Sequence, residues 1–284
     1  MTGSPTATSS AGSSLAELLE IARRVALEGA ELAAARRREG VEVAATKSSI
    51  TDVVTAADRE VEERIRERLA EARPDDGFYG EEGDPGAGPS GLTWVVDPID
   101  GTVNYLYGIP HYAVSVAVVE GDPAAAPSEL RALAGVVANP AAGETFAATA
   151  GGGAKRNGTK LEVPAPASLA EALIATGFSY DAGEREAQAR AFARMAGRVR
   201  DLRRLGAASL DLCALASGRI DGYYEAGLKP WDYAAGALIA REAGAEVRGL
   251  AGRREGPEML IAAHPSIADG LEWLIRDGRL DVVA

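Results

Sequence analysis

Residues 94–105 read Trp-Val-Val-Asp-Pro-Ile-Asp-Gly-Thr-Val-Asn-Tyr, an apolar run followed by two carboxylates on a short turn. The apolar residues predict a strand that delivers Asp97 at its end, and the proline predicts a turn that brings Asp100 three residues later. Two carboxylates on one tight turn can share a hard divalent cation, which prefers oxygen ligands. A helix that begins near Gly101 and Thr102 would add free backbone N–H groups, which bind anions. The segment therefore predicts a metal site beside a phosphate site, although Asp-Pro and Asp-Gly steps are also common in surface loops.

Three more carboxylates lie in patterns that allow either a functional or a structural role. Glu81 precedes a glycine-rich loop, where adjacent glutamates are usually solvated. Asp232 lies at the start of an expected helix, where an acid complements the helix dipole. Asp58 follows Thr55 by three residues, a spacing typical of a capping box. None of the three indicates a site by itself.

Composition narrows the classes of function. The 284 residues are 46% hydrophobic and 25% charged, as in ordinary globular proteins, and they can form a large core. The net charge of −12 disfavours binding to nucleic acid or to anionic lipid surfaces. A single cysteine, Cys213, and two histidines exclude thiolate and multi-histidine metal centres, so a metal would need oxygen ligands.

No apolar run approaches the ~18 residues that a membrane span needs. The segment 1–13 is rich in Ser, Thr, Gly and Ala and lacks the basic start and apolar run of a secretory signal. We therefore expect a cytoplasmic protein with a disordered tail over residues 1–13 and without a membrane or nucleic-acid partner.

Helical and strand patterns are mixed along the rest of the chain. Helices are expected over residues 15–38, 55–73, 184–199, 207–217, 232–242 and 266–275, and strands over 92–96, 112–119, 133–137, 144–149, 172–176, 222–225 and 259–263. The segment 153–160 has the spacing of a phosphate-binding loop, but its Lys–Thr order is reversed, so it predicts a hairpin turn. The mixture predicts layered α and β structure with antiparallel sheet. We expect two halves, 14–160 with the metal and phosphate site and 161–284 completing it, packed as one compact body.

Taken together, these elements closely resemble the inositol monophosphatase family within the metal-dependent, lithium-sensitive phosphatase superfamily. The resemblance spans residues 15–263. The elements that carry it are Glu81, Asp97-Pro-Ile-Asp100-Gly-Thr102 and Trp231-Asp232, with Lys47-Ser-Ser-Ile-Thr-Asp52-Val-Val-Thr55-Ala-Ala-Asp58 upstream and Gly206-Ala-Ala-Ser-Leu-Asp211 and Tyr223-Tyr-Glu225 downstream. The resemblance implies a five-layer αβαβα sandwich of the inositol monophosphatase and fructose-1,6-bisphosphatase type and, usually, a homodimer. It also implies Mg²⁺-dependent hydrolysis of phosphate monoesters with two or three Mg²⁺ ions per site.

The same resemblance implies roles for individual residues. The metal ligands fall on Glu81, Asp97, the backbone carbonyl of Ile99, Asp100 and Asp232. Phosphate meets the metals and the N–H groups of Gly101 and Thr102. Thr102 pairs with Asp58 to position and help deprotonate the attacking water, with Glu81 adjacent. The remaining substrate contacts fall on Gly206, Ala207, Ala208, Glu225 and Asp232. Tyr105 and Ala207 replace a commoner Phe and a commoner Ser or Thr, which bears only on fine specificity.

Physical reasoning favours the same chemistry. Clustered carboxylates repel one another, so the site needs cations at neutral pH. Two Mg²⁺ ions that bridge a phosphate oxygen would neutralise charge on the entering and the leaving oxygen. The leading hypothesis is an inositol-1-phosphate phosphatase that releases myo-inositol and phosphate.

Other substrates and another class of function remain as alternatives. They are histidinol phosphate, fructose 1,6-bisphosphate and 3′-phosphoadenosine 5′-phosphate within the superfamily, and a non-catalytic regulatory protein outside it. Glu225 favours a polyol because a carboxylate accepts hydrogen bonds from several hydroxyls, although it could also hold the cation of histidinol phosphate. Intact residues at every metal position argue against the regulatory alternative.

Overall fold

The computed structural model describes residues 14–41, 43–46, 53–125 and 129–278. The tail predicted over residues 1–13 and the segment 47–52 of the upstream motif lie outside the described residues. The helices are α1 (Leu15–Glu39), α2 (Ala56–Ala72), α3 (Thr102–Tyr107), α4 (Ala182–Met195), α5 (Ala208–Ala216), α6 (Pro230–Glu242) and α7 (Pro265–Asp277). Short 3-10 turns are η2 (Leu169–Glu171) and η3 (Leu250–Gly252).

The strands form a hairpin, a seven-stranded sheet and a five-stranded sheet. The hairpin pairs β1 (Val43–Thr46) with β2 (Val53–Thr55). The larger sheet has the order β3-β4-β5-β6-β7-β8-β9, with bounds β3 (Gly77–Gly80), β4 (Leu92–Asp100), β5 (Ala113–Glu120), β6 (Arg131–Asn139), β7 (Glu144–Thr149), β8 (Gly153–Arg156) and β9 (Thr159–Lys160). The smaller sheet has the order β11-β10-β12-β14-β13, with bounds β10 (Leu173–Thr176), β11 (Asp201–Arg203), β12 (Gly222–Glu225), β13 (Glu246–Arg248) and β14 (Leu260–Ala263).

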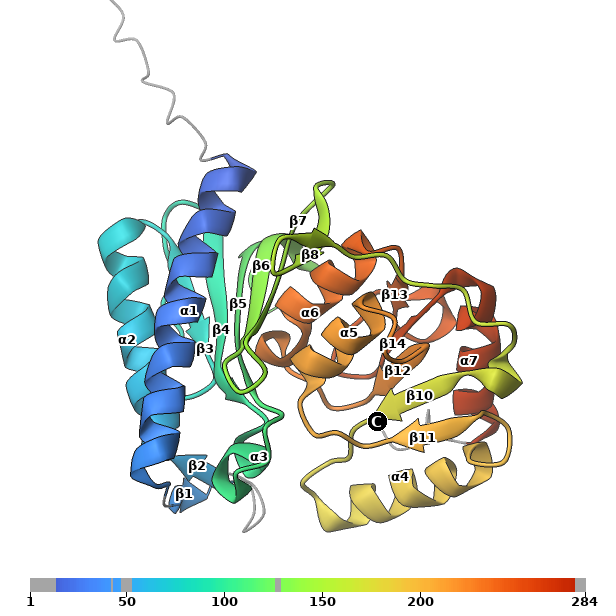
Figure 1. Cartoon of the computed structure of the whole chain (residues 1–284). Coiled ribbons are helices and arrows are strands. Elements are labelled where there is room, and N and C mark those ends of the chain that lie inside the picture. The colour runs from blue at the N-terminus through green and yellow to red at the C-terminus, as the bar shows by residue number, and fades with distance from the viewer. Residues whose placement is uncertain (1–13, 42, 47–52, 126–128, 279–284) are drawn as a thin grey trace, which may run out of the picture.

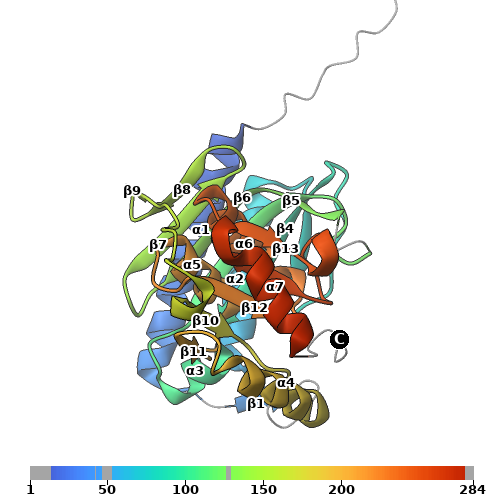
Figure 2. The same cartoon turned by 90° about the vertical axis from the view of Figure 1, so that its right-hand side faces the viewer.

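These elements stack in five layers, as Figure 1 shows. Helices α1 and α2 cover one face of the larger sheet, and α5 and α6 fill the space between the two sheets. Helices α4 and α7 cover the far face of the smaller sheet, which Figure 2 shows from that side. Three clusters of buried apolar side chains lie between these layers. The predicted αβαβα architecture is confirmed: each outer helix layer buries one face of a sheet, and the middle layer buries the facing sides of both sheets.

Local sequence explains where the first two helices begin. Ser14 caps α1, because its hydroxyl accepts a hydrogen bond from the Glu17 N–H at 3.2 Å. Asp58 closes a capping box at the start of α2 by accepting from the Thr55 N–H at 2.8 Å. Both predicted helix starts are therefore confirmed.

Strand β4 differs from its expected form in a way that matters for function. The predicted strand ends near Asp97, but β4 stays paired with β5 as far as Asp100. Asp97 faces Ser115 and Asp100 faces Ala113, so β4 carries one extra residue at this point, a β-bulge. Residues three apart on a regular strand point to opposite faces. The bulge removes this alternation, and both aspartates line the same cavity.

The sequence missed several short strands, namely β1, β2, β3, β11 and β13. Each has only three or four residues, too few for a periodic pattern to show. Within the segment 153–160, β8 and β9 form the predicted hairpin, with left-handed backbone at Asn157 (φ 47°) and Gly158 (φ 83°).

Candidate active site

A cavity of about 450 Å³ lies between the two sheets. The larger sheet contributes the ends of β3 and β4 and the start of α3, and the other half of the chain contributes the ends of β10 and β12 and the starts of α5 and α6. Every site residue predicted from the sequence lines this cavity except Asp58. These are Glu81, Asp97, Ile99, Asp100, Gly101, Thr102, Gly206, Ala207, Ala208, Glu225 and Asp232.

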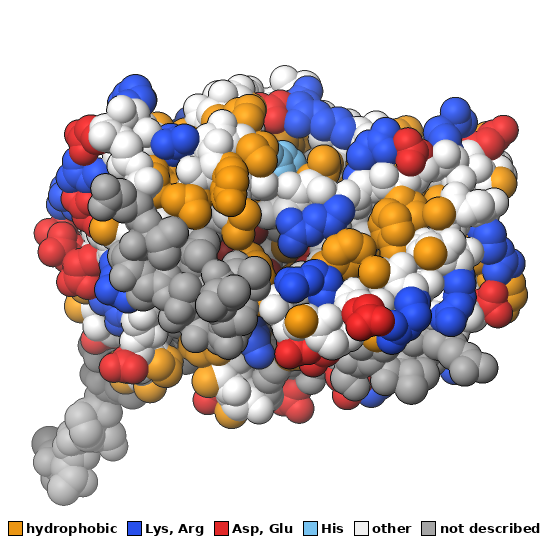
Figure 3. Space-filling view, turned by 90° about the horizontal axis from the view of Figure 1, so that it is seen from below, with side chains coloured by type: hydrophobic (Ala, Val, Ile, Leu, Met, Phe, Trp, Pro, Cys, Tyr) orange, Lys and Arg blue, Asp and Glu red, His pale blue; other side chains and the backbone are white. Residues whose placement is uncertain are grey.

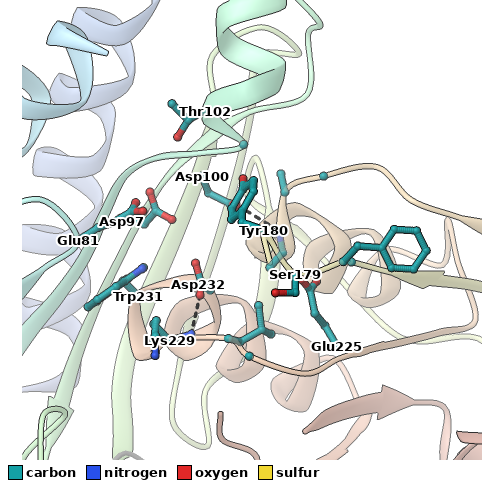
Figure 4. Close-up of a pocket in the computed structure, with 18 of the residues that line it drawn as sticks. Glu81, Asp97, Asp100, Thr102, Ser179, Tyr180, Glu225, Lys229, Trp231 and Asp232 are labelled. Atoms are coloured by element: carbon teal, nitrogen blue, oxygen red, sulfur yellow. Dashed lines mark hydrogen bonds between the residues drawn. The ribbon is translucent and has the colours of Figure 1, made fainter. Parts of the chain in front are cut away.

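Carboxylates gather on one side of the cavity. Figure 4 shows Glu81 beside Asp97, with Asp232 across from them and Glu225 further along the cavity. Asp97 is only 2% exposed. Burial, and then repulsion from Glu81 and Asp100, raise the pKa of Asp97 well above its ordinary value. Burial and Glu81 also raise the pKa of Asp232 well above its ordinary value.

Asp100 is oriented by the start of α5. Its carboxylate accepts from the Ala208 N–H at 3.2 Å, the Ser209 N–H at 2.7 Å and the Ser209 hydroxyl at 2.5 Å. Burial raises the pKa of Asp100, while the hydrogen bonds from Ser209 lower it. Asp100 on β4 thus caps a helix of the other half of the chain and ties the two sides of the cavity together.

The donor set fits a hard divalent cation, because it consists of carboxylates and a backbone carbonyl that would repel one another without a positive charge. As the side chains stand, however, no three acidic or histidine side chains among the described residues are already arranged around one common point. Asp100 accepts three hydrogen bonds from the start of α5, so a metal would compete with these donors for its lone pairs.

Asp58 lies behind the cavity wall and reaches it through Thr102. The Thr102 hydroxyl lies 3.3 Å from Asp58 Oδ1 and 3.1 Å from the Ile99 carbonyl oxygen. Asp58 Oδ2 accepts from the backbone N–H and the hydroxyl of Thr55. Asp58 therefore makes the capping contacts and the Thr102 contact at once.

Backbone shape explains the two glycines on the predicted substrate side. Gly101, at the start of α3, has φ 88°, a left-handed conformation that favours glycine. A methyl group there would lie 3.0 Å from the His111 carbonyl oxygen and 3.2 Å from the Ala207 side chain. Gly206 is also left-handed (φ 89°) and packs against the Arg204 guanidinium. The backbone can approach the cavity closely at both positions.

The cavity is also lined by residues that the sequence did not single out. They are Gly177, Phe178, Ser179, Tyr180, Asp181, Arg204, Ala226, Gly227, Leu228 and Lys229. Most of them lie in loops after β10, β11 and β12, where no spacing rule marks a site. The signal that could have found them is position, because ligands bind beyond the carboxyl ends of strands in layered α/β folds.

Comparison with known proteins identifies the family to which the chain belongs. The model of the inositol monophosphatase family matches residues 14–279, so the chain belongs to this family. Inositol-1-monophosphatase SuhB of Mycobacterium tuberculosis is 44% identical over 275 residues, which cover 90% of this chain and 92% of that protein. Nus factor SuhB of Pasteurella multocida is 39% identical over 232 residues, covering 80% and 83% of the two chains.

A solved structure agrees with the fold. The extragenic suppressor protein suhB of Bartonella henselae superposes with a TM-score of 0.83 at 34% identity, covering 91% of this chain and 98% of that one. Family membership supports a phosphatase, and the family is generally metal-dependent. The predicted family and fold class are therefore confirmed.

Proposed function

We propose that this protein is an Mg²⁺-dependent phosphatase that hydrolyses inositol-1-phosphate to myo-inositol and phosphate. The observation that carries the proposal is the layout of one cavity, with the Glu81–Asp97–Asp232 cluster on one side and Glu225 at the other. The name of the Mycobacterium tuberculosis relative, an inositol-1-monophosphatase, supports the same substrate.

Each group of residues in the cavity has a separate role in the proposed reaction. Glu81, Asp97, the Ile99 carbonyl, Asp100 and Asp232 would hold two or three Mg²⁺ ions. When bound, these ions would neutralise charge on the phosphate and make the attacking water easier to deprotonate.

Thr102, hydrogen-bonded to Asp58, orients that water and takes part in removing its proton, with Glu81 adjacent. Gly101 and Thr102 present backbone N–H groups to the phosphate at the start of α3. Gly206, Ala207 and Ala208 shape the wall that faces the alcohol.

Substrate choice depends on Glu225. Its carboxylate accepts hydrogen bonds from the hydroxyls of a polyol, which are absent from simple alkyl or aryl phosphates. The cavity of about 450 Å³ accommodates a molecule of the size of an inositol phosphate. Histidinol phosphate remains the main alternative, because Glu225 could also pair with its ammonium group.

A phosphate-release panel tests the proposal. Purified protein with Mg²⁺ is given inositol-1-phosphate, histidinol phosphate, fructose 1,6-bisphosphate and 3′-phosphoadenosine 5′-phosphate, with EDTA as the control. We expect inositol-1-phosphate to have the highest kcat/KM and EDTA to abolish release. A higher kcat/KM for another member of the panel would contradict the substrate assignment but keep the phosphatase.

A regulatory function is the second candidate, because the Pasteurella multocida relative is named a Nus factor. A folded, Mg²⁺-loaded protein that releases phosphate from no ester of the panel would favour this candidate.

The surface of the protein bears on whether it binds a membrane, nucleic acid or a second copy of itself. None of the described helices is both long and apolar enough to cross a bilayer. Figure 3 shows acidic, basic and hydrophobic side chains interspersed on one face. The net charge of −12 supports a protein that binds neither nucleic acid nor an anionic membrane surface, and we propose that it acts in the cytoplasm. The family resemblance is the basis for proposing a homodimer, in which the exposed side chains of Tyr107 (76% exposed) and Ile109 (48% exposed) near the end of α3 would be covered.

A further inference from the structure

The Glu225 carboxylate is held from two sides by residues that have no part in the phosphate chemistry. The Tyr223 hydroxyl donates a hydrogen bond to Glu225 Oε2 at 2.5 Å. Gly177, at the end of β10, lies against the same carboxylate, since a methyl group on its Cα would be 2.0 Å from Cδ and from both oxygens. Any side chain at position 177 would therefore have to displace the carboxylate.

The Tyr223 contact is the more specific of the two. Its side chain is fully buried (0% exposed), so the hydroxyl must have a partner within the protein. The hydrogen bond occupies one carboxylate oxygen on one side, and Glu225 keeps other lone pairs for a ligand in the cavity that it lines. The bond thus fixes the side-chain orientation without blocking the carboxylate.

The buried, acidic surroundings of Glu225 disfavour its charged form, so the carboxylate needs stabilising contacts. Burial raises the pKa of Glu225 to about 7, and Asp100 on β4 adds to the rise. Asp211 on α5 is 1% exposed, is close enough to interact with Glu225, and has a buried Oδ1 without a hydrogen-bond partner. The Tyr223 hydroxyl and the Arg204 guanidinium both lower the pKa of Glu225 and so favour its charged form.

We propose that Tyr223 is a positioning residue that, with Gly177, fixes the Glu225 carboxylate in the orientation that selects hydroxyl-bearing substrates. This inference rests on the proposed function, in which Glu225 receives hydroxyls of the alcohol. Residue 223 would then control discrimination between polyol phosphates and simple phosphate esters, without contacting either the phosphate or the metal ligands.

Tyr223→Phe removes the hydroxyl and keeps the ring. The matched control is Tyr224→Phe, since Tyr224 is also buried (2% exposed) but packs in a different one of the three core clusters, beneath α4 and α7. We expect Tyr223→Phe to lower kcat/KM for inositol-1-phosphate about tenfold, the lower end for a lost charge-assisted hydrogen bond. Hydrolysis of p-nitrophenyl phosphate, which offers no hydroxyls, should change less than about twofold, and Tyr224→Phe should leave the ratio of the two esters unchanged.

A double-mutant cycle separates positioning from a general structural effect. In a Glu225→Gln background, Tyr223→Phe should cause little further loss, because the residue acts through Glu225. Gly177→Ala should reproduce the selective loss by displacing the carboxylate. Equal losses on both esters, or full additivity with Glu225→Gln, would overturn the proposal.

A direct measurement keeps the test separate from the identity of the substrate. In the full-length protein with Mg²⁺ and ¹³Cδ-labelled glutamate, the Glu225 resonance is assigned by its absence in Glu225→Gln. We expect its pKa to rise in Tyr223→Phe and to stay unchanged in Tyr224→Phe. An unchanged pKa in Tyr223→Phe would overturn the proposal. If the wild type shows no preference for inositol-1-phosphate over p-nitrophenyl phosphate, the proposed function fails, and the resonance still decides whether Tyr223 holds Glu225.

Discussion

Asp58 illustrates how one side chain can satisfy two interpretations of its spacing. Its position three residues after Thr55 predicts a capping box, and the family resemblance predicts a partner for Thr102. The structure contains both contacts, one on each carboxylate oxygen. Sequence spacing could give the first contact, because it is local. It could not give the second, because Asp58 and Thr102 are 44 residues apart and meet only through packing of α2 beneath β4.

Thr102→Ala tests the water-positioning role. We expect kcat to fall by roughly 100- to 10,000-fold, as when general acid–base assistance is lost. KM should change much less, because the metal ligands and the backbone N–H groups still hold the phosphate. Steady-state kinetics on inositol-1-phosphate decide the matter, and a variant that chiefly raises KM with kcat intact would exclude the role.

Asp58→Asn separates the two functions of Asp58. If Asp58 assists Thr102, the variant should lose activity as Thr102→Ala does. If it only caps α2, the variant should cost about 1 kcal/mol of stability or less and keep full activity. Thr55→Ala is the matched control, because it removes a capping hydroxyl and leaves the contact between Asp58 and Thr102 in place.

Glu225 predicts a pH dependence specific to polyol substrates. Its pKa, raised by burial to about 7, lies above its ordinary value, so the carboxyl gains a proton as the pH falls through 7. The ratio of kcat/KM for inositol-1-phosphate to that for p-nitrophenyl phosphate should therefore decline below about pH 7. Taking the ratio cancels the titration of the metal site. Glu225→Gln should flatten the profile, and a wild-type ratio independent of pH between 5 and 9 would contradict the assignment.

At the scale of elements, the long helices and the core strands could be predicted, and the irregular features could not. Leu18, Val25 and Ala22 recur at helical spacing on the buried face of α1, so periodicity was sufficient there. The bulge between Asp97 and Asp100 leaves no such signal, because the proline suggests a turn whether or not pairing with β5 continues. That bulge brings both aspartates to the cavity.

Close packing of β6 against α6 gives a testable prediction at the scale of elements. A methyl group on Gly135 would lie 2.9 Å from the Ala235 Cα, a backbone atom that cannot turn aside. Gly135→Ala should therefore lower the free energy of unfolding by about 1–3 kcal/mol, as for other overpacked sites. Gly197→Ala is the control, because nothing lies near its added methyl group. Urea unfolding of both variants is the measurement, and equal stabilities would show that the layers can separate without cost.

At the scale of the whole molecule, hydrogen bonds beside the cavity connect the two halves of the chain. Asn104, after β4, donates from Nδ2 to the Leu205 carbonyl oxygen at 2.8 Å, and Asp100 caps α5. The sequence could name the acidic residues of the site through the family resemblance. It could not show that Asp100 turns toward α5, because its partner Ser209 lies 109 residues away.

The acidic cluster should make the metal-free protein sensitive to pH. The folded-state pKa of Asp97 is raised, so folding favours its protonated form, and this contribution to stability is lost as the pH rises from about 4. In EDTA at pH 7, Asp97→Asn should therefore have a higher Tm than the wild type, and the difference should vanish near pH 4. Saturating Mg²⁺ should reverse the order at pH 7, because only the wild type keeps the full ligand set. Thermal unfolding gives both comparisons, and an Asn variant that melts lower than the wild type in EDTA would contradict the account.

The most direct measurement is phosphate release from inositol-1-phosphate by wild type and Asp97→Asn across a Mg²⁺ titration. We expect release by the wild type to require Mg²⁺ and to stop in EDTA. The folded Asp97→Asn protein should lose most of kcat even at saturating Mg²⁺, because stabilisation by a bound metal is worth several kcal/mol. Circular dichroism confirms that the variant is folded. Near-normal turnover by the folded variant at saturating Mg²⁺, or release by the wild type in EDTA, would contradict a metal-dependent phosphatase built on this carboxylate cluster.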